Sequence, residues 1–357
     1  MTWSPDVPYN ELPLLPPSVE LETHRVLKAT IGAREALARL DARASALPNP
    51  AVLINAIPLL EAQASNEIEN IVTTTDELFE AAAYDLDASP AAREALRYRT
   101  ALRLGFDELS SGRPITAHTA ARLCSEIRGH EVAFRRGEVF IGDPIQRRRV
   151  YTPPAEPIAL DALLGNWSFF VNEPSELDPL VRMAVAHYQF EAIHPFHDGN
   201  GRTGRIVNVL MLCGAGLLQL PLLYLSRFII ENKDEYYRLL NAVTSSEAWE
   251  EWVIYMIEGV RSTSQHTLLL VDQIEEVQGV VATAVRSVLR SADADLVAAV
   301  MEQPYCRIRD VVERCGVTRQ TAVRWLRALE ETGVLTEVRV GREVLFINAA
   351  LMDVLRR

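Results

Sequence analysis

Apolar residues recur three and four positions apart along most of this 357-residue chain. That spacing is typical of helices that bury one face, and the strict alternation typical of strands is scarce. We therefore predict a mainly α-helical protein. The predicted helices span residues 19–45, 51–66, 76–83, 91–109, 116–128, 160–172, 179–192, 199–218, 232–243, 247–261 and 262–291.

Two short stretches in the middle of the chain depart from the helical pattern. Residues 139–141 and 149–152 are rich in β-branched and aromatic side chains, and residues 142–144 between them read Gly-Asp-Pro. Glycine and proline favour turns between such runs. The pattern predicts a β-hairpin inside an otherwise helical region.

The spacing of apolar positions changes again from residue 293 onward. Short helices are predicted over residues 296–302, 308–315 and 319–331, the last of them capped by Thr318. Two β-like runs follow, over residues 335–340 and 343–347, and Gly341-Arg342 joins them. Three helices followed by a terminal hairpin resemble a winged helix-turn-helix.

These patterns divide the chain into four predicted parts. The division is an N-terminal helical region over residues 1–100, a core over 101–261, a connecting helix over 262–292 and a winged helix-turn-helix over 293–357.

The composition is that of an ordinary globular protein, with 48% apolar and 24% charged residues. The longest apolar run, residues 207–225, is interrupted by Asn208, Gln219 and Pro221, which predicts a buried helix and no membrane span. Residues 1–17 are polar and proline-rich, unlike a signal peptide. The four cysteines lack zinc-like spacing, so we expect reduced thiols in a cytoplasmic protein.

The net charge of −12 argues against a general nucleic-acid binder, but it does not exclude a local basic surface. Residues 293–357 carry ten arginines and ten acidic residues, so the predicted module is neutral. Arg319, Gln320, Arg324 and Arg327 are expected to project from its third helix. DNA binding, positioning of a protein target and formation of a homodimer are all left open for this module.

The stretch over residues 194–205 reads HPFHDGNGRTGR and combines groups suited to a polyphosphate. Gly199, Asn200 and Gly201 stand at the predicted start of a helix, where unpaired N–H groups attract anions and glycine permits close approach. Arg202 and Arg205 follow three positions apart, so they neighbour each other on the helix. Guanidinium groups suit phosphate oxygens, and solvated surface arginines are the alternative interpretation.

His194 and Asp198 bring the reactive groups of the same stretch. The imidazole of His194 has an unperturbed pKa of about 6.5, which suits a general base. Asp198 is the acid of the stretch, and Mg²⁺ is often held by one carboxylate together with phosphates. A helix cap is the alternative role for Asp198. Phe196 is expected to anchor the loop in the core.

This stretch resembles the signature of the Fic family, HPFxDGNGRxxR, at every fixed position. The resemblance implies a Fic-type helical core with a small β-hairpin flap. It also implies a protein adenylyltransferase, a nucleotidyltransferase that moves AMP from ATP to a Ser, Thr or Tyr hydroxyl of a target protein or of the enzyme itself. Mg²⁺ is the implied metal, and Mn²⁺ is an alternative.

The implied roles follow position by position. His194 is the base, Asp198 binds the metal between the α- and β-phosphates, Gly199, Asn200 and Gly201 line an anion hole, and Arg202 and Arg205 hold the β- and γ-phosphates.

A second stretch, residues 65–70, reads SNEIEN and resembles the family's inhibitory motif, [S/T]xxxE[G/N]. Ser65 and Glu69 lie four positions apart on one helical face, and Asn70 fills the motif's last position. The resemblance implies a salt bridge from Glu69 to Arg205 that withholds this arginine from the γ-phosphate. An exposed helical glutamate is the alternative. In some family members this glutamate also supports AMP removal.

Two further groups of residues follow from the resemblance. The predicted hairpin matches the family's flap, and Val150 and Tyr151 are expected to clamp the modified residue of the target. Asn232, Tyr236 and Tyr237 resemble the pattern after the signature and are expected to border the adenine, with core packing as the alternative.

Three other functions stay open beside AMP transfer. They are a hydrolase that removes AMP from proteins, a DNA-binding regulator that uses the core as a nucleotide sensor, and transfer of a different phosphate-containing group. No membrane partner is expected.

Overall fold

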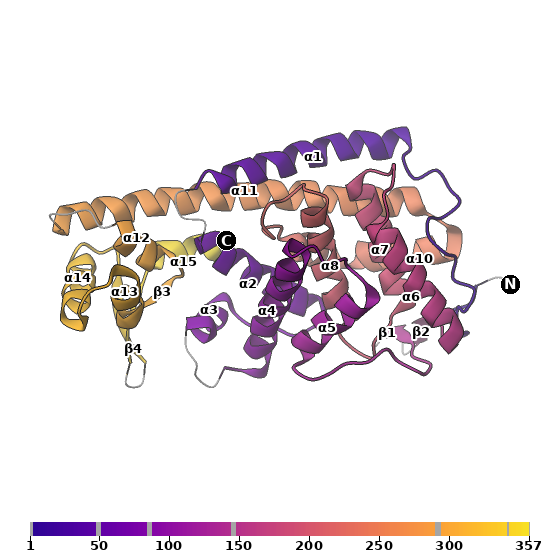
Figure 1. Cartoon of the computed structure of the whole chain (residues 1–357), viewed down its shortest axis with the longest axis horizontal. Helices are drawn as coiled ribbons and strands as arrows, with labels where there is room; N and C mark the ends of the chain where they lie inside the picture. Colours follow the sequence, from indigo (N-terminus) through magenta and orange to yellow (C-terminus); the bar gives the residue numbers. More distant parts are fainter. Residues whose placement is uncertain are drawn as a thin grey trace.

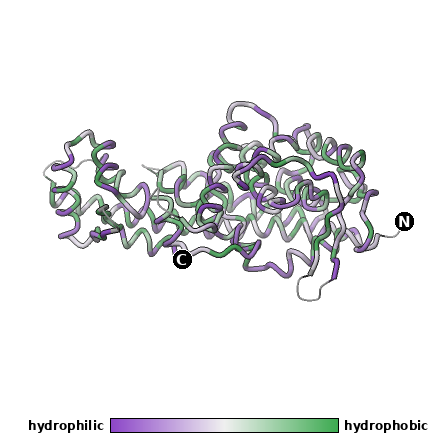
Figure 2. The backbone as a smooth tube through the Cα atoms, turned by 90° about the horizontal axis from the view of Figure 1, so that it is seen from below, coloured by the Kyte–Doolittle hydropathy of each residue, from purple (hydrophilic) through white to green (hydrophobic). Residues whose placement is uncertain are grey.

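A computed structural model of the chain describes residues 3–47, 51–83, 88–143, 148–289, 294–340 and 343–356. The described residues form fifteen helices and five short strands, which confirms the mainly α-helical prediction. The molecule is elongated, with a bundle of helices at one end of a long helix and a smaller module at the other (Figure 1). Hydrophobic and hydrophilic positions intermix along the helices, as amphipathic packing requires (Figure 2).

The long helix is α11 (Trp249–Val288), and α1 (His24–Ser45) lies along it (Figure 1). The sequence predicts two helices here, divided at residue 262, and that division is wrong. The helix continues through Thr263 and Ser264, whose hydroxyls donate to the carbonyls of Gly259 and Val260 one turn earlier. The two polar side chains are therefore satisfied inside one continuous helix.

The bundle surrounds α8 (Asn200–Gly214), whose side chains are buried on nearly every face. Its other helices are α2 (Ala51–Ile68), α3 (Thr75–Ala83), α4 (Pro90–Ser110), α5 (Ala117–Arg128), α6 (Pro157–Asn172), α7 (Pro179–Ile193), α9 (Leu225–Glu231) and α10 (Lys233–Ser246). Thr116 caps α5 as predicted, because its hydroxyl accepts a hydrogen bond from the backbone of Thr119.

The helix that follows the signature stretch is shorter than predicted. It ends at Gly214, not at residue 218, and Gly216 adopts a positive φ of 69° that turns the chain away. Pro221 keeps the rest of the apolar run out of a helix. The run is still largely buried, and its last residue begins α9, a helix that the periodicity missed because it has only seven residues.

The predicted hairpin exists, with its strands shifted. β1 (Ile141–Asp143) pairs with β2 (Arg148–Tyr151) in antiparallel fashion. β1 therefore begins at Ile141, the last residue of the predicted first strand. Gly142 and Asp143, which were expected in a turn, pair with β2, and the register of the pairing shifts between Ile141 and Gly142. Pro144 lies outside the described residues.

The C-terminal module comprises the described residues from 294 to 356. Its helices are α12 (Ala294–Met301), α13 (Ile308–Cys315), α14 (Arg319–Glu331) and α15 (Ala349–Leu355), and its strands are β3 (Tyr305–Arg307), β4 (Thr336–Val340) and β5 (Glu343–Ile347). The predicted helices and hairpin are present, and Thr318 caps α14. The strands form an antiparallel sheet in the order β3-β5-β4.

The sequence pattern missed β3 and α15 in this module. Three buried residues are too few to show a strand period, and α15 has only seven residues. Gly341, Arg342 and the predicted boundary between residues 292 and 293 lie outside the described residues. None of the helices in the described ranges combines the length and apolar character needed to cross a membrane.

Candidate active site

The signature stretch forms the loop between α7 and α8. His194 ends α7 with a positive φ of 50°, and Gly199 precedes α8 with a φ of 90°. The side chain of Asn200 closes the loop, since it donates to the carbonyl of Phe196 and accepts from the amide of Phe196, both at 2.8 Å. Phe196 is fully buried and stacks on Phe134, which confirms its role as an anchor.

Arg135 fixes the same loop from the outside, and sequence reasoning missed it. Its guanidinium donates to the carbonyls of His194 at 2.7 Å and Ile193 at 3.0 Å, and also to Gly137 and Pro154. Arg135 is only 2% exposed. In the sequence it stands beside Arg136, and only the fold shows which of the two is buried.

A pocket of about 270 Å³ opens beside His194. It is lined by residues of the loop, α7, α8, the hairpin and α10, together with the residue after α2: Glu69, Ile141, Val150, Tyr151, Tyr188, Glu191, Ala192, His194, Gly201, Arg205, Tyr236, Tyr237, Leu240, Asn241 and Thr244. The structure therefore brings the predicted base, one predicted arginine and the predicted inhibitory glutamate into one pocket.

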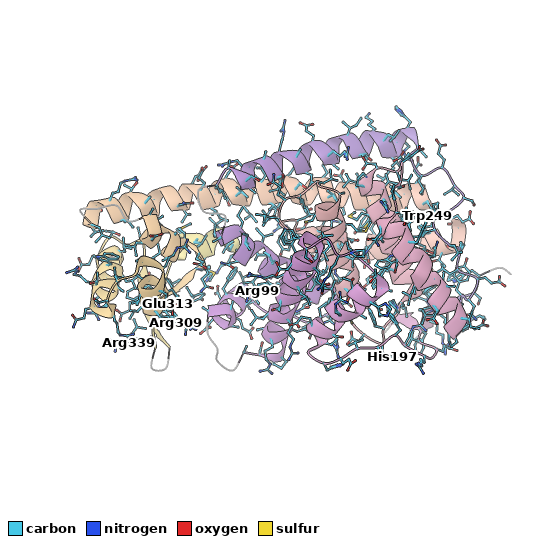
Figure 3. The ribbon with its side chains drawn as sticks, viewed as in Figure 1. Arg99, His197, Trp249, Arg309, Glu313 and Arg339 are labelled. Atoms are coloured by element: carbon cyan, nitrogen blue, oxygen red, sulfur yellow. The ribbon has the colours of Figure 1, made fainter. Side chains whose placement is uncertain are left out.

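His194 faces this pocket as a neutral base. Burial lowers its pKa to about 4, because a buried imidazolium loses its hydration, while the backbone of Glu191 opposes this effect. The neighbouring His197 is exposed at the surface of the molecule (Figure 3), as expected for a position with no role.

Arg205 is 1% exposed and is held by the end of α2. Its Nε donates to the Ser65 hydroxyl at 2.8 Å, and its Nη2 donates to the Ser65 carbonyl and to Glu69 Oε1, both at 2.9 Å. Burial disfavours the guanidinium, but the charge of Glu69, the nearby Tyr236 and Tyr98, and the hydrogen bond to Glu69 together outweigh this cost, so the pKa of Arg205 is raised. Burial likewise opposes ionisation of Glu69, yet Arg205 keeps its pKa below the ordinary value.

The end of α2 determines where the side chains of the SNEIEN stretch lie. The helix ends at Ile68, so Glu69 lies one residue beyond it and still shares the face of Ser65. Asn70 adopts a φ of 63°, a left-handed conformation that glycine and asparagine tolerate best. Gly201 approaches from α8 so closely that an added Cβ would lie 2.5 Å from Glu69 Oε1.

Asp198 and Arg202 form a separate ion-pair network outside this pocket. Asp198 accepts from Arg202 Nη2 at 3.0 Å and contacts Arg128 Nη1 at 2.5 Å, and Arg202 also binds Glu94 of α4. Arg202 is 1% exposed, whereas Asp198 is 56% exposed. Gly199 and Asn200 also lie outside the pocket lining, and the side chain of Asn200 is occupied by the loop.

The residues near Asp198 fit a metal that arrives with a nucleotide. Within the described ranges, no cluster of three or more His, Cys, Asp or Glu side chains is placed to hold a metal ion. An exposed carboxylate next to the N-terminus of α8 instead fits Mg²⁺, which commonly takes one or two protein carboxylates and completes its shell with phosphates and water.

The residues expected near the adenine divide into two groups. Tyr236 and Tyr237 line the pocket, but Tyr236 is buried and its hydroxyl lies 2.8 Å from Nε2 of His187, so it also packs in the core. Tyr237 is 43% exposed and is available to a ligand. Asn232 does not line the pocket, and its side chain donates to the carbonyl of Phe228.

The predicted flap residues both line the pocket. Tyr151 is buried, and its hydroxyl donates to the Ala192 carbonyl at 2.9 Å, which attaches the hairpin to α7. The next residue, Thr152, accepts a backbone hydrogen bond from Tyr9 of the N-terminal arm. Tyr151 thus holds the base of the hairpin, and Val150 is the more accessible of the pair.

Glu191 is a second carboxyl in the pocket that sequence reasoning missed. Burial raises its pKa to about 7, and the charge of Glu69 raises it further while Arg205 opposes both. Its Oε1 is buried without a hydrogen-bond partner among the described residues. The sequence offers no signal for this residue, because one glutamate in a helix is common.

Comparison with protein-family models gives three matches along the chain. Residues 27–107 match the model described as Fic/DOC family N-terminal, and residues 116–212 match the Fic/DOC family. Residues 281–351 match the C-terminal domain of protein adenylyltransferase SoFic-like proteins. Together the three models cover more than half of the chain.

Curated relatives match smaller parts of the chain. It is 28% identical over 164 residues to protein adenylyltransferase fic-1 of Caenorhabditis elegans, which covers 43% of this chain and 29% of that protein. It is 32% identical over 108 residues to fic-1 of Caenorhabditis briggsae, which covers 30% and 19%. The matched part is therefore less than a third of the length of these relatives.

Solved structures share the fold. A Fic family protein from Desulfovibrio desulfuricans G20 superimposes with a TM-score of 0.59 at 18% identity, covering 93% of this chain and 97% of that one. Residues 134–508 of Fic-1 from Caenorhabditis elegans give a TM-score of 0.54 at 18% identity, covering 70% and 74%.

Proposed function

Because the chain belongs to the Fic/DOC family, we propose that it transfers AMP from Mg·ATP to a hydroxyl group of a protein and that Glu69 restrains this activity. One observation carries the proposal. A neutral, half-buried histidine, a buried arginine and Gly201 of the first turn of α8 meet in one pocket, with a β-hairpin at its rim. The names of the curated relatives, protein adenylyltransferases, support the same chemistry.

The reaction follows from the positions of these groups. His194 accepts the proton of the target hydroxyl as its oxygen attacks the α-phosphorus. The new P–O bond forms while the bond from the α-phosphorus to the bridging oxygen of the β-phosphate breaks, and pyrophosphate leaves. Arg205, once free of Glu69, stabilises the charge of the departing phosphates. Val150 and Tyr151 align the target segment beside the hairpin.

Asp198 is the residue proposed to hold Mg²⁺. The bound metal would neutralise phosphate charge. Arg128 and Arg202 pair with the carboxylate of Asp198 and keep it at the N-terminus of α8. Arg202 would contact the phosphates from the same position.

The direct test of the function uses two forms of labelled ATP. Label in the α-phosphate should appear on protein, whereas label in the γ-phosphate should be released in pyrophosphate. Transfer of γ-label would show phosphoryl transfer instead. Because Glu69 binds Arg205 in the parent protein, the assay is carried out with the Glu69→Gly variant.

Removal of AMP from proteins is a second candidate function. Glu69 lines the same pocket as His194 and stays ionised, so a carboxylate is present that can orient an attacking water. Release of free AMP from a modified protein by the parent, but not by Glu69→Gly, would support it. Homodimer formation, DNA binding by the C-terminal module and a cytoplasmic location stay predictions of the sequence.

Replacing Asp198 with alanine is expected to weaken Mg²⁺-dependent ATP binding and to reduce transfer at least tenfold, because the metal loses its protein carboxylate. The measurement is a Mg²⁺ titration of ATP binding by calorimetry. Asp161→Ala, an exposed aspartate of α6, is the matched control. An unchanged Mg²⁺ requirement in Asp198→Ala would leave Asp198 with only a structural role.

The pH profile of transfer should reflect the environment of His194. With a pKa of about 4, its imidazole is already neutral at mildly acidic pH, so kcat/KM should not fall near the usual histidine value of about 6.5. Any inflection near pH 7 is assigned to Glu191, whose pKa is about 7. It should disappear in Glu191→Gln, and an inflection at 6.5 that survives this change would contradict the low pKa of His194.

A further inference from the structure

Helix α2 has two functional faces. One face carries Glu61 and Ser65, followed by Glu69 beyond the helix end, and it meets Arg205. The opposite face carries Leu60, Gln63, Ala64 and Glu67, which recur at helical spacing and line a cavity of about 250 Å³.

The other walls of this cavity come from distant parts of the chain. Arg227 and Ile230 belong to α9, His266 and Leu270 to α11, and Arg356 follows the last helix of the C-terminal module. The cavity, here called the junction cavity, therefore separates the inhibitory helix from the end of the module. It lies on the side of α2 that faces away from Arg205.

A chain of hydrogen bonds also connects the inhibitory helix to the module. The side chain of Gln63 donates to the Thr73 carbonyl at 2.8 Å and accepts from the Thr75 hydroxyl at 3.2 Å. These bonds tie α2 to the first turn of α3. Asp76, the next residue of α3, accepts two hydrogen bonds from Arg356, at 2.8 and 2.7 Å.

Two further contacts join the same parts. α3 packs against β3 of the module, and the Asn55 side chain of α2 lies 3.4 Å from the Glu302 carbonyl. The module thus touches both ends of the segment that carries Ser65 and Glu69. Figure 1 shows α2 and α3 on the side of the bundle nearest the module.

We propose that the C-terminal module regulates the restraint by holding α2 and α3 in place, and that the restraint is released when α2 shifts into the junction cavity. This inference rests on the proposed function, since it assigns the regulation of the same Glu69–Arg205 contact. The physical reason is space. Protein interiors are densely packed, so a helix can retreat from Arg205 only where room exists, and the junction cavity provides it.

Loosening the contact should raise activity. Arg356→Ala and Asp76→Ala are each expected to increase auto-AMPylation about two- to fivefold, the range of an exposed ion pair. Because both remove the same contact, the double variant should match either single one. Arg339→Ala, an exposed arginine elsewhere in the module (Figure 3), is the matched control and should behave as the parent.

Filling the cavity should have the opposite effect. Ala64→Leu places a larger side chain in the junction cavity, so in the Arg356→Ala background it should return auto-AMPylation to the parent level. Ala64→Val is the smaller substitute if the leucine variant does not fold. Hydrogen exchange of residues 51–68 should rise in Arg356→Ala and fall again when Ala64 is replaced.

The same substitutions in the Glu69→Gly background distinguish failure of the proposed AMP transfer from failure of the proposed regulation by the module. There the restraint is already absent, so Arg356→Ala and Ala64→Leu should change nothing. If Glu69→Gly transfers no AMP, the proposed function fails. If Glu69→Gly is active while folded Arg356→Ala and Asp76→Ala equal the parent in activity and exchange, the module does not hold the restraint and this inference is overturned.

Discussion

Replacing His194 with alanine is expected to abolish AMP transfer while ATP binding persists. The change removes the proton acceptor for the target hydroxyl, and general-base catalysis is typically worth about 10²–10⁴ in rate. The phosphate-binding groups stay in place, because Arg135 holds the loop through the backbone carbonyls of residues 193 and 194, not through the imidazole.

The experiment compares His194→Ala with His197→Ala, both in the Glu69→Gly background. His197 is three positions away in the same loop but exposed, so its replacement should leave transfer unchanged. Transfer of α-label is the measure of activity, and calorimetry with Mg·ATP is the measure of binding. Labelling by His194→Ala at a rate near that of the His197→Ala control would rule out His194 as the base.

The contiguous residues of the signature were predictable from the sequence, because their chemistry lies within twelve positions and their order is specific. Local rules place His194 at the end of one helix and Gly199 before the next, and the structure has them there. The contact between Glu69 and Arg205 joins positions 136 apart. It was predictable only through resemblance to the inhibitory motif, since helical spacing alone shows no partner.

The missed residues act through tertiary structure. Arg135 is buried because three loops converge on its guanidinium, and Glu191 has a raised pKa because α7, α8 and α10 enclose it. Neither environment leaves a pattern in the local sequence. The same reason applies to Arg202, which as a residue type suits phosphate but is paired here with Glu94 and Asp198.

Errors in the secondary structure have local causes. The predicted division of α11 at residue 262 is wrong, because the hydroxyls of Thr263 and Ser264 bond to the preceding turn and the helix continues. The helices α9 and α15 have seven residues each, too few for a reliable period. These errors leave His194, Arg205 and Glu69 unaffected, because these residues lie in or next to α7, α8 and α2, which the sequence predicted.

Replacing Glu69 with glycine is expected to raise auto-AMPylation by roughly ten- to hundredfold. The reason is competition for one cation, since Arg205 is bound by Glu69 and Ser65 and cannot hold the γ-phosphate in the same geometry. Coupling of this kind is on the order of 1–3 kcal/mol. Glu69 is 35% exposed, so solvent weakens the pair, whereas the burial of Arg205 strengthens it.

Graded variants test whether charge or shape restrains the site. Glu69→Gln keeps the shape and loses the charge, so its activity should lie between those of the parent and Glu69→Gly. Ser65→Ala removes the hydroxyl but keeps the carbonyl contact to Arg205, so its gain should be smaller. The double variant Glu69→Gly, His194→Ala should be silent, because release of Arg205 cannot replace the base.

The pKa of Glu69 makes this restraint persistent. Because Arg205 lowers that pKa below its ordinary value of about 4.5, the carboxylate stays ionised at neutral and mildly acidic pH. Acidification to about pH 6 therefore cannot release Arg205, and the Glu69→Gly effect should be as large there as at pH 8. Equal activity of the parent and Glu69→Gly across ATP concentrations, with both Mg²⁺ and Mn²⁺, would refute the restraint. That result would mean that freeing Arg205 does not change how the phosphates of ATP are held.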